Sequence, residues 1–125
     1  MMEKEFGPYP LALRLKAIGF DEPCFGWYSN REGNVLIQGY CETYLGIENC
    51  VKAPLYQQAF RWFREKYTLY SIISTIMYTY PNLEFYFKIQ GLNDGAMIDK
   101  FNTYEEAELA CLDKLIEIVE NEKPL

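Results

Sequence analysis

Three segments of the chain place apolar residues three or four positions apart, the spacing that gathers them on one face of an α-helix. The first segment covers residues 10–18 and is followed by Gly19, which suits the left-handed conformation that ends many helices. The last covers residues 103–120 and opens with Thr103 and Glu106, whose spacing is that of a capping box. Both segments are therefore predicted to be amphipathic helices.

The middle segment, residues 54–67, has the clearest amphipathic pattern. At about 100° per residue, Phe60, Phe63 and Tyr67 fall within one apolar arc. Lys66 falls in the same arc, and we expect its aliphatic stem to lie on the core while its amine reaches water. The segment is therefore predicted to be a helix whose aromatic side is buried.

Four shorter segments are rich in β-branched and aromatic residues, which is typical of strands. Residues 24–29 and 35–40 flank a polar turn and predict one antiparallel hairpin. Residues 70–80 and 83–90 meet at a Pro-Asn turn and predict a second hairpin. Residues 41–53 have weak periodicity and are predicted to be mainly loop.

The predicted order of elements is αββαββα. We expect an α+β fold in which the two hairpins form one antiparallel sheet and the helices pack on one of its faces. The chain has 125 residues, of which 50% are hydrophobic and 17% aromatic. A chain of this length and composition can bury an ordinary core, so a single domain spanning residues 1–125 is predicted.

The chain carries a formal net charge of −6. An acidic surface repels phosphate backbones, so binding to DNA or RNA is not expected. No stretch of ~18 apolar, uncharged residues predicts a membrane span, and the charged first residues do not resemble an export signal. We therefore expect a cytoplasmic protein without a membrane partner.

The four cysteines are expected to be free thiols, as is usual in a reducing compartment. Cys24 and Cys111 lie in apolar patterns and are predicted to be small core residues. A disulfide between Cys41 and Cys50, which fall in the predicted loop, is the alternative for that pair. With no Cys-x-x-Cys pair and no histidine, the sequence predicts no zinc site.

No set of residues in the sequence suggests catalysis. Without histidine, a general base would have to be a carboxylate, a lysine, a tyrosine or a thiolate. The carboxylates of residues 105–120 are predicted to form a solvated helix surface. Asp94 and Asp99 share a predicted loop without EF-hand spacing, which favours loop polarity over a metal site. We therefore predict no catalytic residues, no metal and no cofactor.

The polar side of the middle helix holds the main candidate binding residues. Gln57, Arg61 and Arg64 lie three and four positions apart, so they share one helix face and could together hold a phosphate or a carboxylate. The alternative is a solvated face on which Arg61 pairs with Glu65. Trp62 lies at the edge of the apolar arc, where it is either an anchor for a partner or the border of the core.

Tyrosines of the two predicted hairpins form a second candidate set, because an uncovered sheet face that carries tyrosines can stack on a ring or a base. The alternative is that their hydroxyl groups reach solvent from a buried sheet. The set consists of Tyr28, Tyr40, Tyr78, Tyr80 and Tyr86.

Five stretches of the sequence carry a likeness to a known family: residues 11–13, 19–24, 53–67, 103–108 and 115–117. In these stretches the chain resembles a small uncharacterised protein family of bacteroidete phages and prophages. The resemblance covers the three predicted helices and the turn after the first. It implies a mobile-element protein made in the cytoplasm of a bacterial host, and it implies no catalytic residue and no substrate.

Two functions fit these features. The first is a non-enzymatic binding module for a protein partner, or for a second copy of the chain, because aromatic residues are abundant and a catalytic set is missing. The second is a protein that binds or sequesters a small anionic ligand such as a nucleotide, held by Gln57, Arg61 and Arg64. An enzyme is a third hypothesis, which a cleft containing thiols or carboxylates with shifted pKa values would support.

Overall fold

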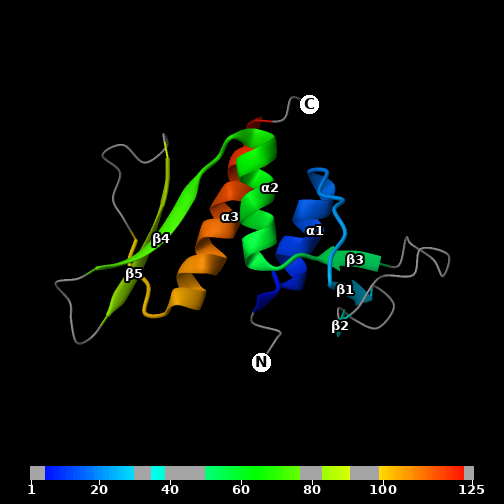
Figure 1. Cartoon of the computed structure of the whole chain (residues 1–125), viewed down its shortest axis with the longest axis horizontal. Coiled ribbons are helices and arrows are strands. Elements are labelled where there is room, and N and C mark those ends of the chain that lie inside the picture. The colour runs from blue at the N-terminus through cyan, green and yellow to red at the C-terminus, as the bar shows by residue number, and fades with distance from the viewer. Residues whose placement is uncertain (1–4, 30–34, 39–49, 77–82, 91–98, 123–125) are drawn as a thin grey trace.

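The computed structural model describes residues 5–29, 35–38, 50–76, 83–90 and 99–122. These residues form three helices and five strands (Figure 1). In chain order the elements are α1 (Tyr9–Ala17), β1 (Gly26–Ser29), β2 (Val35–Gln38), β3 (Cys50–Ala53), α2 (Tyr56–Tyr67), β4 (Ser71–Ile76), β5 (Glu84–Ile89) and α3 (Tyr104–Glu122). The α+β class is confirmed, and each predicted helix is present to within a residue or two of its predicted ends.

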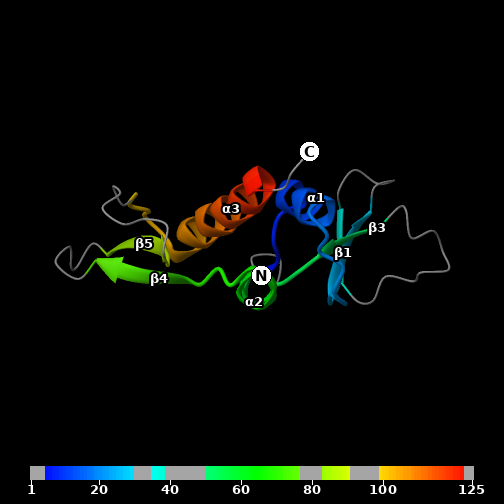
Figure 2. The same cartoon turned by 90° about the horizontal axis from the view of Figure 1, so that it is seen from above.

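The helices occupy the middle of the molecule and the sheets lie at its two ends (Figures 1 and 2). α1 packs on β3 and on α3, whereas α3 packs on β4 and β5. α2 packs on α3 and follows β3 directly, so it carries the chain from one sheet to the other. The helices therefore separate the sheets rather than covering a common face.

The described strands form two antiparallel sheets. In the first sheet β1 lies between β2 and β3, so that Tyr28 pairs with Leu36 on one side and with Val51 on the other. In the second sheet β4 pairs with β5. Both predicted strand pairs are present, while their predicted turns, at residues 30–34 and 80–82, lie outside the described residues.

The prediction of one continuous sheet is wrong, and the end of the predicted loop is a strand. β3 pairs with β1 and buries Val51 and Ala53 in a cluster that includes Ala12 of α1. β3 has only four residues, so its alternation of apolar and polar side chains is too short to be recognised in the sequence. The sheets stay apart because α2 lies between β3 and β4 in the chain, and because each sheet packs on a different helix.

α1 ends in a Schellman motif, in which two main-chain amides bond back into the last turn. The amide of Phe20 donates to the carbonyl oxygen of Leu15 at 2.9 Å, and the amide of Gly19 donates to that of Lys16 at 3.1 Å. Gly19 has a φ of +104°. The predicted left-handed cap at Gly19 is therefore confirmed.

α2 ends at a strained residue. Thr68 has φ 57° and ψ 34°, a left-handed conformation that costs a residue with a Cβ roughly 1–2 kcal/mol. The amide of Thr68 donates to the carbonyl oxygen of Arg64 at 3.2 Å, and that of Leu69 donates to Phe63 at 3.1 Å. These bonds, together with the full burial of Phe63, hold the strained turn in place.

The main core lies between the three helices and β5. Phe63 is fully buried, and Phe60 and Trp62 beside it are each 5% exposed. The Trp62 ring makes edge-to-face contacts with Phe20 and Tyr67, at centroid distances of 5.2 and 5.4 Å, a favourable arrangement for aromatic pairs. The prediction that the aromatic side of α2 is buried is confirmed.

A smaller core lies between α1 and the three-stranded sheet. Its buried members are Phe6, Ala12, Tyr28, Val51 and Ala53. Gly26 is required beside this cluster, because a Cβ atom on it would lie 2.8 Å from Cε1 of Phe6. The cluster therefore fixes the segment that precedes α1 against the sheet.

Candidate functional site

The predicted anion-binding residues lie on the outer side of α2. Gln57 and Arg61 are exposed and Arg64 is half-buried. Nη2 of Arg61 lies 3.9 Å from Oε1 of Glu22, so its acidic neighbour is a different residue from the Glu65 expected in the alternative prediction. An ion pair between such exposed groups contributes little to stability. The face on which these residues gather thus carries a carboxylate as well as guanidinium groups.

Trp62 points away from this face and into the core. Its side chain is 5% exposed, which fits its interpretation as a border residue of the core. The amine of Lys66 lies 5.3 Å from the centroid of the Trp62 ring, within reach of a cation–π interaction. Lys66 itself is exposed, so its amine lies near the border of the core at a position open to water.

The predicted tyrosine set does not form a common surface in the described part of the chain. Tyr28 is buried and its hydroxyl donates to the carbonyl oxygen of Gly7 at 2.8 Å, whereas Tyr86 is half-buried in the other sheet. Tyr40, Tyr78 and Tyr80, together with Cys41 and Asp94, lie outside the described residues.

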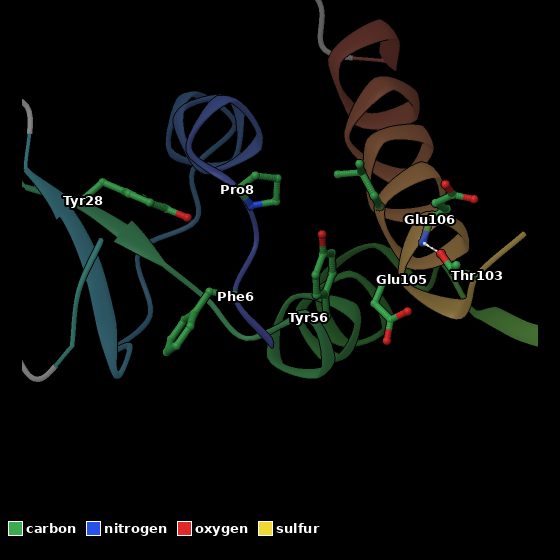
Figure 3. A pocket seen from close by; sticks show the side chains of 8 residues that line it. Phe6, Pro8, Tyr28, Tyr56, Thr103, Glu105 and Glu106 are labelled. Carbon is green, nitrogen blue, oxygen red and sulfur yellow. Dashed lines mark hydrogen bonds between the residues drawn. The ribbon is translucent and has the colours of Figure 1, made fainter. Parts of the chain in front are cut away.

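An open groove of about 450 Å³ lies between the segment before α1, the start of α2 and the first turns of α3 (Figure 3). We call it the Tyr56 groove. Its lining residues are Phe6, Pro8, Tyr28, Tyr56, Thr103, Glu105, Glu106 and Leu109. Most of them are apolar or aromatic, the acidic groups come from α3, and Leu109 is 42% exposed. The groove therefore combines an apolar lining with negative charge on one side.

The wall formed by the segment before α1 is held by three kinds of contact. Phe6 forms a β-bridge with the residue that precedes α2. The amide of Gly7 donates to the carbonyl oxygen of Pro54 at 2.9 Å, and the Gly7 carbonyl accepts the Tyr28 hydroxyl. Tyr56, in the first turn of α2, rises beside this wall (Figure 3). The wall is thus positioned by both the sheet and α2.

The opposite wall is positioned by the N-terminal cap of α3. The amide of Glu106 donates to Oγ1 of Thr103 at 3.1 Å, which confirms the predicted cap. Oε1 of Glu106 accepts from the amide of Asn102, also at 3.1 Å, one residue further back than in the usual capping box. In Figure 3 Glu105 lies on the side of α3 that is nearer to Tyr56, and Glu106 lies on the far side. Of the two carboxylates among the described lining residues, Glu105 is therefore the nearer to Tyr56.

Glu108 is a buried carboxylic acid next to this wall. Its side chain is 9% exposed and forms no hydrogen bond or ion pair with any residue that the structure describes. Burial raises its pKa from 4.5 to about 7, and repulsion from Glu5 and Glu105 contributes to the rise. Glu108 therefore changes charge near neutral pH.

Tyr56 directs an unpaired hydroxyl into the groove. Its side chain is 7% exposed, and its hydroxyl has no hydrogen-bond partner among the described residues. Burial, with a further contribution from Glu108, raises the pKa of Tyr56 to about 12. The hydroxyl is thus a protonated donor at neutral pH, and Figure 3 shows it between Pro8 and α3.

The buried thiols are not activated. Cys24 and Cys111 are free and buried, as predicted for core residues. Burial raises the pKa of Cys24 to about 12 and that of Cys111 to about 11. Thiols with such pKa values remain protonated at neutral pH and are poor nucleophiles. Within the described ranges, no three His, Cys, Asp or Glu residues are grouped so as to hold a metal ion.

The sequence places Glu108 among the solvated carboxylates of α3, and for this residue the prediction is wrong. Glu108 precedes the buried Leu112 by four positions and Cys111 by three. Both spacings put it on the buried stripe of the helix, so the signal was present in the periodicity. The groove itself has no such local signal, because its described lining comes from four separate parts of the chain.

Comparison of the chain with protein-family models, with curated proteins and with solved structures finds no match. The helices in the described residues fall short of the length and apolar character of a membrane span. The geometry of the Tyr56 groove is therefore the basis for a proposed function.

Proposed function

We propose that the protein is a non-enzymatic binding module of phage or prophage origin that binds a protein partner in the cytoplasm of a bacterial host. The Tyr56 groove is the surface proposed to bind it. The observation that carries this proposal is an open, mainly apolar groove bordered by the exposed Leu109 and containing the unpaired hydroxyl of Tyr56. Aromatic residues in partly open sites are common anchors for protein partners.

The charge of the groove favours a protein segment over a nucleotide-like ligand. The charged residues among the described part of its lining, Glu105 and Glu106, are both acidic, and such a site repels phosphate. The alternative proposal places a small anionic ligand on α2, at Gln57, Arg61 and Arg64. That alternative predicts a higher melting temperature with cyclic or linear nucleotides, because a ligand that binds only the folded state stabilises it.

A catalytic role is a weaker proposal than binding. Glu108 has a pKa of about 7, which is suitable for a general base. It is nevertheless 9% exposed and absent from the groove lining, so a substrate in the groove would not reach it directly. The protonated thiols of Cys24 and Cys111 offer no nucleophile either.

The proposal is tested by capture of host proteins with matched surface variants. Leu109→Ser removes the exposed apolar side chain at the groove, and Leu13→Ser removes one of similar exposure, 40% against 42%, on α1. We expect wild type and Leu13→Ser to enrich the same host protein, and Leu109→Ser to lose it while keeping the circular dichroism spectrum of the wild type. Identical enrichment by all three proteins would contradict the proposal.

A further inference from the structure

With the Tyr56 groove taken as the proposed protein-binding surface, we propose that it receives a partner segment in which an arginine or lysine lies between apolar residues. The cationic side chain contacts Glu105, and a main-chain carbonyl of the segment accepts the Tyr56 hydroxyl.

Negative charge at the groove is not balanced from within the described chain. Glu105 and Glu106 line it, Glu5 and Glu105 lie close enough to Glu108 to interact with it, and the lining residues that the structure describes include no Lys or Arg. Several basic residues of the described chain are paired elsewhere. These pairs are Arg14 with Asp113 and Glu120, Lys52 with Asp21, Arg61 with Glu22, and Lys114 with Glu117. A partner cation would relieve the repulsion that Glu5 and Glu105 exert on Glu108.

The start of α3 accounts for only part of this acidity. Acidic residues are favoured in a first helical turn by the helix dipole, and Glu106 also completes the cap. The capping bonds of the described residues do not involve the Glu105 side chain, and Glu105 lies on the side of α3 nearer to Tyr56 (Figure 3). Glu108 lies beyond the first turn and is buried, where a carboxylate without a partner is costly. Glu105 therefore retains capacity for a cation, and Glu108 adds negative charge next to the groove when it ionises.

Tyr56 supplies the second, independent contact. The Tyr56 hydroxyl has no hydrogen-bond partner among the described residues. Since no buried side-chain N or O atom of those residues lacks a partner, the hydroxyl is open to the groove although the residue as a whole is only 7% exposed. Because its pKa of about 12 keeps it protonated, it can donate to an acceptor in the groove. Every residue of a polypeptide carries such an acceptor in its carbonyl group.

The aromatic lining suits a cation with an apolar stem. Phe6, Tyr28 and Tyr56 line the groove, and aromatic rings attract ammonium and guanidinium groups that lie within about 6 Å. The same protein shows this arrangement on α2, where the amine of the exposed Lys66 lies over the Trp62 ring. The exposed Leu109 adds apolar surface for the residues next to the cation.

A displayed library of random peptides tests this chemistry directly. Peptides that bind wild type and Leu13→Ser but not Leu109→Ser are the groove-dependent set, and we expect Arg or Lys between apolar residues to be enriched in it. Glu105→Gln should weaken an arginine peptide about threefold to fivefold, as for accessible ion pairs. Its citrulline analogue, which is neutral, should bind both proteins equally. Glu117→Gln, on the same helix but outside the groove, should leave both affinities unchanged.

The affinity of the arginine peptide should also depend on Glu108. Among the described residues, the ionisable groups that interact with Glu108 are Glu5, Glu105, Tyr56, Tyr104 and Cys111. The tyrosines and the thiol have raised pKa values and stay neutral. Ionisation of Glu108 adds negative charge between pH 6 and 8, so binding should tighten over this range in wild type and not in Glu108→Gln.

The outcomes separate this inference from the proposed function. A groove-dependent set with acidic or neutral consensus, or equal affinity for the arginine and citrulline peptides, would overturn the cationic segment and leave the groove as a binding surface. No groove-dependent peptide at all would overturn both. Self-association that Leu109→Ser abolishes and Leu13→Ser does not would place a second copy in the groove and would also overturn the inference.

Discussion

Replacing Glu108 with glutamine should make the protein more stable at pH 8 and should remove most of its pH dependence between pH 5 and 8. The wild-type carboxylic acid is buried and lacks a described partner. Ionising it in the folded state is therefore costly. Glutamine has nearly the same shape and no charge at any pH. Since the chain contains no histidine, few other side chains titrate in this range.

The size and sign of the effect follow from the pKa of Glu108. The folded pKa of about 7 lies above the ordinary value of 4.5, so the folded state holds the proton more tightly than the unfolded state. The resulting stability is fully present below pH 4.5 and is lost as pH rises through 7. At ~1.4 kcal/mol per pKa unit, the loss is at most on the order of 3 kcal/mol. A buried amide without a partner costs about 1–3 kcal/mol, so the net gain of Glu108→Gln at pH 8 should be about 1 kcal/mol.

Urea unfolding of wild type, Glu108→Gln and Glu117→Gln at pH 5, 6, 7 and 8 measures this effect. The free energy of unfolding of wild type and of the exposed control Glu117→Gln should fall together as the pH rises. That of Glu108→Gln should stay nearly flat and cross the wild-type curve. Parallel curves for wild type and Glu108→Gln would refute the assignment of a buried, neutral carboxylic acid to Glu108.

Three other substitutions test the fold. Thr68→Gly should raise the free energy of unfolding by about 1 kcal/mol in urea titration, because glycine adopts the left-handed conformation of Thr68 without strain; a loss of stability would contradict this. Gly26→Ala should lower it by ~1–3 kcal/mol through the clash with the buried Phe6, and a double-mutant cycle with Phe6→Leu should show a compensating coupling. Arg14→Gln should destabilise by up to ~1 kcal/mol at pH 7. The loss of stability should be smaller at acidic pH. Arg14 holds the pKa of Glu120 below its usual value, and the ion pair is lost as the pH falls through that lowered pKa. An equal loss at pH 7 and pH 3 would contradict it.

The helices could be predicted because their signals are local. Gly19 and Thr103 mark helix ends through bonds to residues within one or two turns, and the burial of Phe63 follows from a periodicity that spans a single helix. Such features need no knowledge of the rest of the fold. They fixed the α+β class but not the arrangement of the strands.

The strand arrangement and the Tyr56 groove could not be predicted, because both depend on contacts between distant segments. β3 becomes a strand by pairing with β1, and its four residues carry too short a pattern to reveal this. The groove joins Phe6, Tyr56 and Leu109, which no sequence motif connects. The polar pattern of α2 predicts Arg61 and Arg64 as binding residues. Tyr56, whose hydroxyl is unpaired among the described residues, lies instead at the buried start of the same helix.

Site-specific photo-crosslinking in host cells tests most directly whether the Tyr56 groove binds a protein partner. A photoreactive phenylalanine analogue is placed at Leu109 in one variant and at Leu13, of similar exposure, in another. We predict that light produces a discrete heteromeric adduct from position 109 and none from position 13. No adduct from position 109, or the same adducts from both positions, would contradict the proposal that this groove binds a protein.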